Sequence, residues 1–283
     1  MEKEVTFNLY GKHFAAKRWH GDAAYPALAL HGWLDNSGSF DFLAPLLPQY
    51  NLVAPDLAGH GLTDHRSEDS PYNIWQDVGE MHQLGEQLGW DKFILIGHSR
   101  GAAIASLFAA TFPEKVAALV LLDGFLPEVV KAAEAPSQLA QSIRDKSRYL
   151  HRSAKLYRSL DEAIAPRLEG PIALSRQAAE AIARRGVARS EAGYHWRADH
   201  RLRGASEFKL TLDHSEAFAR RIACPTLLML AATEISEYHR HLLSLNDRFS
   251  ATLMENAGHH LHMEESAAQV AEEINRFLRP LLD

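Results

Sequence analysis

A serine between two glycines ends a run of strand-forming residues in the first half of the chain. The segment KFILIGHSRG finishes in Gly97-His98-Ser99-Arg100-Gly101, which matches the pattern G-x-S-x-G, and an alanine-rich helical segment follows at once. A serine at the apex of such a strand-to-helix turn takes a strained backbone, and glycines two residues to either side avoid a Cβ clash. The turn exposes the hydroxyl at the carboxyl edge of a sheet. Ser99 is therefore the predicted nucleophile.

A serine hydroxyl needs a base to take its proton, and histidine suits this role because it titrates near neutral pH. The chain has 16 histidines, so position must select among them. We expect the base on a loop after the last strand, where SATLM is followed by ENAGHHLHMEE. This placement predicts His259 as the base, with His260 and His262 as rivals. The cluster lacks the spacing H-E-x-x-H, so no metal site is predicted there.

Two acidic residues compete for the role of orienting this histidine. Asp123 follows the apolar run VAALVLL, and Glu234 follows TLLMLAA. A carboxylate in either place would hold the imidazole and stabilise its cationic form. We prefer Asp123 and keep Glu234 as the alternative acid.

A tetrahedral intermediate also needs N–H donors for its oxyanion. The backbone N–H of Arg100, directly after the predicted nucleophile, is one candidate. The loop in LALHGWLDN follows an earlier strand and makes the N–H of Trp33 the second candidate. We expect the side chain of His31 to brace this loop rather than to react.

The composition excludes several other classes of protein. The chain has 283 residues, 46% hydrophobic and 23% charged, with a net charge of −6, and its 30 Lys and Arg are spread among 36 Asp and Glu. We therefore expect no nucleic-acid partner. No apolar run reaches the roughly 18 residues of a membrane span. The only cysteine is Cys224, and the first residues do not resemble a secretory signal, so we expect a cytoplasmic location. Oligomeric state cannot be predicted.

Apolar runs alternate with helical segments along the first part of the chain, which predicts a parallel α/β sheet. VTFNLY and HFAAKRW resemble a hairpin, and buried strands are expected at ALAL, NLVAP, KFILIG, VAALVLLD, CPTLLMLAA and SATLMEN. No convincing strand occurs from about Pro127 to His214, where the segments are charged and helical. We expect residues 1–126 and 215–283 to form the core and residues 127–214 to form an inserted helical cap.

These residues together resemble the α/β-hydrolase superfamily and, within it, the serine hydrolase-like group. The resemblance is carried by HGWLDNSGSFDFLAPLLP, DLAGHGLTD, WDKFILIGHSRG, TFPEKVAALVLLDG, RADHRLR and GHHLHMEE. It implies an α/β-hydrolase fold with a doubly wound, mostly parallel sheet, a helical cap and no cofactor. It also implies Ser99 as nucleophile, His259 as base, and Trp33 and Arg100 as oxyanion donors. The group often lacks an aspartate after the strand that matches TLLMLAA, which favours Asp123 as the acid.

The expected function is hydrolysis of a small to medium carboxylic ester through an acyl-enzyme formed on Ser99. Within the same fold, carbon–carbon bond hydrolysis and perhydrolase chemistry are alternatives. A non-catalytic ligand receptor that keeps the pocket is an alternative of a different class. In DLAGHG we expect Asp56 to fix the backbone near the site. In RADHRLR we expect Arg197, Asp199 and Arg201 to form ion pairs within the cap.

Overall fold

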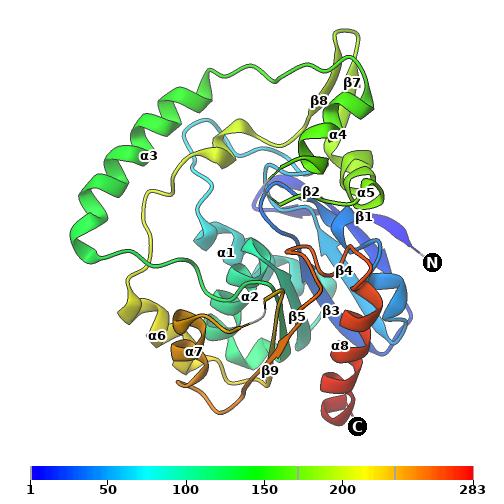
Figure 1. Cartoon of the computed structure of the whole chain (residues 1–283), viewed down its shortest axis with the longest axis vertical. Helices are drawn as coiled ribbons and strands as arrows, with labels where there is room; N and C mark the ends of the chain where they lie inside the picture. The colour runs from blue at the N-terminus through cyan, green and yellow to red at the C-terminus, as the bar shows by residue number, and fades with distance from the viewer. Residues whose placement is uncertain (1, 171, 233, 283) are drawn as a thin grey trace.

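The computed structural model, which describes residues 2–170, 172–232 and 234–282, is built around one eight-stranded sheet (Figure 1). Its strands are β1 (Lys3–Leu9), β2 (Lys12–Trp19), β3 (Tyr25–Leu30), β4 (Tyr50–Pro55), β5 (Phe93–His98), β6 (Val116–Leu122), β9 (Thr226–Leu230) and β10 (Phe249–Leu253). They are ordered β1-β2-β4-β3-β5-β6-β9-β10. Strand β2 is antiparallel to β1 and β4, and the remaining neighbours are parallel. This order confirms the predicted mostly parallel sheet.

Helices cover both faces of the sheet. They are α1 (Ile74–Leu88), α2 (Arg100–Thr111), α6 (Leu212–Arg221), α7 (Glu237–Leu243) and α8 (Ala267–Leu282). Along β5, Leu95 packs with α1 and α2, whereas Ile94 and Ile96 pack on the opposite face with α8. Because both faces are buried, the central strands need apolar residues at every position, which explains their uninterrupted apolar runs.

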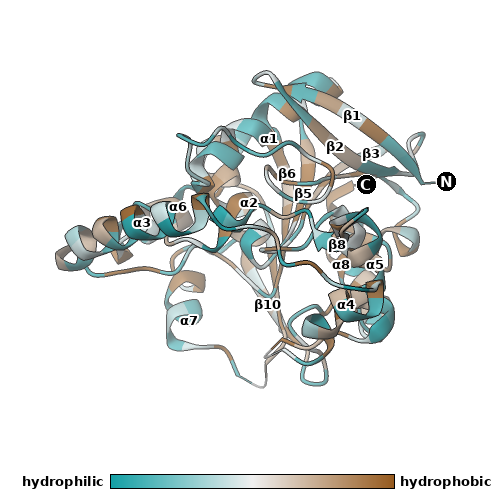
Figure 2. Cartoon of the chain, turned by 90° about the horizontal axis from the view of Figure 1, so that it is seen from above, coloured by the Kyte–Doolittle hydropathy of each residue, from teal (hydrophilic) through white to brown (hydrophobic). Residues whose placement is uncertain are grey.

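The segment 127–214, which we expect to form the cap, contains helices and one small hairpin. Its elements are α3 (Ala135–Leu150), α4 (Leu160–Leu168), α5 (Arg176–Gly186), β7 (Val187–Ser190) and β8 (Gly193–Trp196). The sequence predicted no strand here, yet β7 and β8 pair antiparallel. Each strand has four residues, and none of the eight is fully buried, so no apolar run marks them. Figure 2 shows α3 lying to one side of the molecule, away from the sheet.

Charged side chains join this segment to the core. The guanidinium of Arg185 lies 2.7 Å from the buried carboxylate of Asp56. Asp56 also accepts hydrogen bonds from the amides of Ser37 and Leu62, so it fixes the backbone as expected. A cation beside a buried carboxylate offsets the cost of removing that carboxylate from water. The ion pair therefore links α5 to the core, and loss of the cation alone would leave the carboxylate buried and unpaired.

A second contact involves the motif RADHRLR. Arg201 and Asp199 form an ion pair of 2.7 Å, and Tyr72 donates a hydrogen bond to Asp199 over the same distance. The expected ion pair is thus present between these two residues, whereas Arg197 forms none within the described residues. No helix of the described residues is both long and apolar enough to cross a membrane.

Candidate active site

Ser99 lies between β5 and α2 in a backbone conformation that non-glycine residues rarely adopt. Its φ is 51° and its ψ is −113°, and its amide donates to the carbonyl of Leu122 in the neighbouring strand over 2.9 Å. The glycines leave room for this turn. A Cβ at Gly101 would lie 2.0 Å from the carbonyl oxygen of Leu30, and one at Gly97 would lie 2.5 Å from the Gly101 oxygen. Both distances are well below van der Waals contact, so the packing requires glycine at each position.

A third glycine that the sequence analysis missed also contacts this turn. A Cβ at Gly124 would lie 2.9 Å from the Cα of Ser99 and 2.8 Å from its carbonyl oxygen. The dipeptide Asp-Gly at the end of β6 was a signal for a tight turn. Gly124 comes close to Ser99 because β5 and β6 pair side by side, and the dipeptide alone does not predict that pairing.

The structure brings Asp123 and His259 together. His259 lies on the loop between β10 and α8, and its Nδ1 is 2.5 Å from Asp123 Oδ2. An ionised carboxylate only accepts hydrogen bonds, so Nδ1 carries the proton and Nε2 is left as the acceptor. The other carboxylate oxygen of Asp123 accepts from the amide of Ala231 over 2.8 Å. The carboxylate is thus held on both of its oxygens.

The alternative acid lies elsewhere. Glu234 is exposed on the loop after β9, and within the described ranges it has no hydrogen bond or ion pair with His259. Likewise, no hydrogen bond joins Ser99 Oγ to the His259 ring in the part of the chain that the structure describes. Catalytic contacts are often long without substrate and shorten when it binds.

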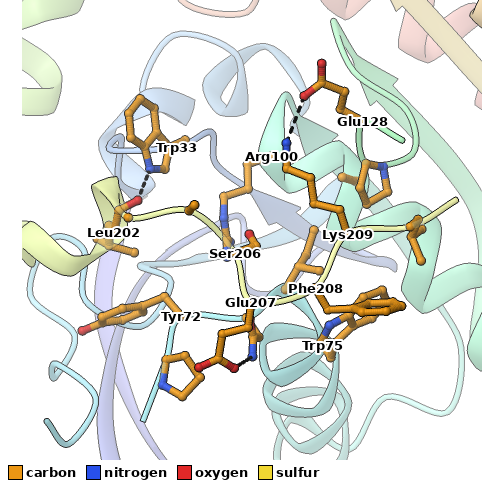
Figure 3. Close-up of a pocket in the computed structure, with 18 of the residues that line it drawn as sticks. Trp33, Tyr72, Trp75, Arg100, Glu128, Leu202, Ser206, Glu207, Phe208 and Lys209 are labelled. Atoms are coloured by element: carbon orange, nitrogen blue, oxygen red, sulfur yellow. Dashed lines mark hydrogen bonds and ion pairs between the residues drawn. The ribbon is translucent and has the colours of Figure 1, made fainter. Parts of the chain in front are cut away.

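The two predicted oxyanion donors are available. Neither the Arg100 amide nor the Trp33 amide donates a hydrogen bond to any atom of the described residues. The Arg100 amide is at the N-terminus of α2, where helix amides have no intrahelical acceptor. Trp33 is 46% exposed, and its indole N–H donates to the carbonyl of Leu202 over 2.8 Å (Figure 3). This bond joins the loop after β3 to the cap segment.

His31 braces the same loop, as expected. Its Nε2 accepts a hydrogen bond from the amide of Leu57 over 2.9 Å, so its Nδ1 donates to the carbonyl of Gly32 over 2.8 Å. Burial lowers the pKa of His31, which keeps the ring neutral. The ring therefore acts as a fixed link between two loops.

His98, inside the predicted turn, links Ser99 to the histidine loop. Its side chain is buried, and its Nε2 lies 2.9 Å from the carbonyl oxygen of His259. A carbonyl only accepts, so Nε2 is the donor. Burial lowers the pKa of His98 to about 3, so the ring is neutral at physiological pH.

A cavity of about 800 Å³ opens between Ser99 and the chain segment 201–210. Aromatic side chains form much of its wall, among them Tyr72, Trp75 and Phe208 (Figure 3). At its edge, Lys209 lies 3.3 Å from Glu128 in an ion pair. Local sequence patterns do not single out these wall residues, because they come from separate loops and from the segment 127–214.

Comparison with known proteins agrees with this architecture. A family model described as the alpha/beta hydrolase fold matches residues 26–266. A serine hydrolase-like protein of Danio rerio is 31% identical over 277 residues, which cover 93% of this chain and 84% of that protein. A hypothetical protein of Pseudomonas aeruginosa PAO1 has a crystal structure with a TM-score of 0.91 and 36% identity, covering 99% of both chains.

A more distant structure, the thioesterase domain from the curacin biosynthetic pathway, has a TM-score of 0.86 at 23% identity and covers 98% of this chain and 99% of that chain. It shares the fold. The predicted resemblance is confirmed by a family match over most of the chain and by a relative of similar length. The chain belongs to the α/β-hydrolase family, with serine hydrolase-like proteins among its relatives.

Proposed function

We propose that this protein is a serine hydrolase that cleaves carboxylic esters through an acyl-enzyme on Ser99. One observation carries the proposal: His259 Nδ1 lies 2.5 Å from Asp123 Oδ2, on loops next to a strained serine turn. A structural turn needs neither a strained serine nor a paired histidine beside it. The combination is what acyl transfer requires.

In the acylation step, Ser99 Oγ attacks the carbonyl carbon of the ester. His259 Nε2 takes the hydroxyl proton and then gives it to the leaving alkoxide, so the alcohol departs neutral. Asp123 stabilises the transient imidazolium and keeps Nδ1 protonated. The amides of Trp33 and Arg100 hydrogen-bond the oxyanion of the tetrahedral intermediate.

In the second step, water replaces the alcohol. The water oxygen attacks the acyl carbon while His259 Nε2 takes one proton from the water. The oxyanion of this second tetrahedral intermediate accepts hydrogen bonds from the amides of Trp33 and Arg100. The proton then returns to Ser99 Oγ as the carbon–oxygen bond breaks. Net hydrolysis gives one acid and one alcohol, and every step uses groups of this chain.

The cavity supports a small to medium, largely apolar substrate. Its aromatic wall favours apolar acyl or alcohol groups, which are stabilised by about 25 cal/mol for each Å² buried. Arg100, the residue after the serine, lines the cavity, and its guanidinium is already bound to the buried Asp77 over 2.7 Å. The Arg100 guanidinium is therefore not free to bind an anionic group of the substrate.

Steady-state hydrolysis of a p-nitrophenyl ester series, from acetate to laurate, tests this function. We expect turnover by the wild type and a loss of about 10⁴-fold or more in Ser99→Ala. Ser106→Ala is the matched control, because Ser106 is a buried serine of α2 away from the cavity. It should keep wild-type turnover.

Absence of ester turnover by the folded wild type would contradict the proposal. The same result, combined with a ligand-dependent rise in Tm across an ester and acid panel, would favour the receptor alternative. Turnover of a diketone without turnover of esters would favour carbon–carbon bond hydrolysis.

A further inference from the structure

Behind the Ser99 turn, three buried side chains from distant segments face a common space. They are Asp35 after β3, His98 at the end of β5 and His260 on the loop before α8. Their side chains are 1%, 1% and 6% exposed. Each offers one ligand atom, and these atoms lie within 4.8 Å of one another.

The hydrogen bonding of His98 leaves a lone pair directed at a carboxylate. Its Nε2 donates to the carbonyl of His259 over 2.9 Å, so Nδ1 of the neutral ring carries no proton. This Nδ1 lies 3.8 Å from Asp35 Oδ2 and has no hydrogen-bond partner among the described residues. The Nδ1 lone pair is thus a buried acceptor without a donor, and a cation between it and the carboxylate would interact favourably with both.

His260 can join the same site through a change of tautomer. Its Nε2 lies 3.0 Å from Asp35 Oδ2, whereas its Nδ1 has no partner in the described ranges. Moving the proton from Nε2 to Nδ1 would break no other hydrogen bond. His260 Nε2 would then present a lone pair beside the carboxylate.

The backbone next to these atoms carries no side chain. A Cβ at Gly32 would lie 2.8 Å from His98 Nδ1 and 3.0 Å from Asp35 Oδ2. Any residue other than glycine would occupy the space beside both atoms. The nearest cation, the Arg167 guanidinium, lies 3.2 Å from the other carboxylate oxygen, Oδ1, and so leaves Oδ2 facing the histidines.

We propose that Asp35 Oδ2, His98 Nδ1 and His260 Nε2 bind one late first-row divalent metal ion, with Zn²⁺ as the best fit. Two imidazole nitrogens and one carboxylate oxygen are a donor set typical of Zn²⁺, and water would complete four-coordination. Tetrahedral ligands at Zn²⁺ distances lie about 3.3 Å apart. The separations of 3.0 and 3.8 Å from Oδ2 are close to this value, and the two histidine nitrogens lie within 4.8 Å of each other.

Binding would fix the two loops that carry the proposed catalytic groups. His98 precedes Ser99, and His260 follows His259, so the ion would link the serine turn to the histidine loop. An ion that binds only the folded state raises its stability by mass action. We therefore expect a higher Tm in the presence of Zn²⁺.

The test is isothermal titration of the EDTA-treated full-length chain with Zn²⁺, alongside Asp35→Asn and His260→Gln. We expect about one equivalent bound by the wild type and binding weaker by about tenfold or more in both variants. His241→Gln is the matched control, because its Nε2 lies 2.8 Å from Glu216 in an exposed histidine–carboxylate pair. The control should bind as the wild type does, and circular dichroism checks the fold of each variant.

No stoichiometric binding by the wild type would overturn the proposal, and so would undiminished binding by both variants. If either variant fails to fold, electron paramagnetic resonance of Cu²⁺ bound to the wild type tests which residues are the ligands. Hyperfine coupling to two nitrogens is expected; any other number of nitrogen ligands, or a thiolate signature from Cys224, would overturn the assignment. None of these measurements depends on ester turnover, so this site and the proposed function can fail separately.

Discussion

The carboxyl edge of the sheet and the cap segment, residues 127–214, are held by different kinds of contact. At the sheet edge, Ser99 and Asp123 both have positive φ, at 51° and 47°, and their places are fixed by backbone hydrogen bonds and close glycine packing. In the cap segment, side-chain contacts supply the connection: the buried ion pair Arg185–Asp56 and an apolar cluster in which Ile164 and Ile182 pack with Met263. Helix α3 has a single buried residue, Ser142.

This contrast suits two different needs: exact positions for the proposed catalytic groups at the sheet edge, and a variable cavity wall in the cap segment. Acyl transfer needs its groups positioned to within a fraction of an ångström, and a strained backbone confined by close packing provides such positions. The cap segment forms part of the cavity wall, and long charged side chains allow that wall to vary with little change in the core. We therefore expect substitutions at the sheet edge to abolish turnover and substitutions in the cap segment to change stability or specificity.

The largest effect should follow from removing the carboxylate at the sheet edge. Asp123→Asn should lower kcat by about 10⁴-fold and leave the fold intact, because an amide favours the wrong tautomer of His259. Glu234→Gln is the matched control and should leave kcat unchanged. Single-turnover hydrolysis of an activated ester measures both. The reverse pattern would make Glu234 the acid.

A side chain added at Gly101 in the Ser99 turn should destabilise the fold. Gly101→Ala places a Cβ 2.0 Å from the Leu30 oxygen, so we expect a loss of about 4 kcal/mol or more in the free energy of unfolding. Gly258→Ala is the control: it lies next to His259, and a Cβ there would have no neighbour within 4 Å. The free energy of unfolding of Gly258→Ala should stay within about 0.5 kcal/mol of the wild-type value. Urea unfolding measures both variants, and equal effects would argue against a closely packed turn.

Breaking the contact between the cap segment and the core should lower the free energy of unfolding by less than the change at Gly101, but by a measurable amount. Arg185→Met leaves the buried Asp56 carboxylate without its cation, and we expect a loss of about 3 kcal/mol. Arg176→Ala breaks exposed pairs with Glu180 and Asp161 and should cost less than about 0.5 kcal/mol. Thermal unfolding monitored by circular dichroism compares them. Similar Tm values for the two variants would show that the buried pair does not stabilise the cap.

The smallest expected effect is on the reactivity of the single thiol, Cys224, which lies just before β9. Burial raises the pKa of Cys224 to about 11, so at pH 8 the native protein should not react with iodoacetamide. Unfolding in urea should expose the thiol and restore ordinary reactivity. Rapid modification of the native protein, followed by mass spectrometry, would show that this strand opens more readily than the packing implies.

Sequence reasoning predicted most of the sheet because both of its faces are buried, which leaves a run of apolar residues at each central strand. It predicted Ser99 because a serine flanked by two glycines at this spacing has few other structural uses. It left Asp123 and Glu234 open, since the choice depends on where the backbone directs each carboxylate.

Two features could not be read from local patterns. The hairpin β7–β8 is short and partly exposed, so its residues lack a strand signal. The cluster of Asp35, His98 and His260 joins three segments far apart in the chain. Spacing within GHHLHMEE argued against a metal site, because two of the three proposed ligands lie outside that segment.

Intact-mass labelling with a fluorophosphonate probe, on wild type and Ser99→Ala side by side, tests the central claim most directly. The account predicts one adduct on the wild type, none on Ser99→Ala, and a peptide map that places the adduct on Ser99. Folded wild type that gains no adduct, or a Ser99→Ala variant that is labelled equally, would contradict an activated serine at this turn.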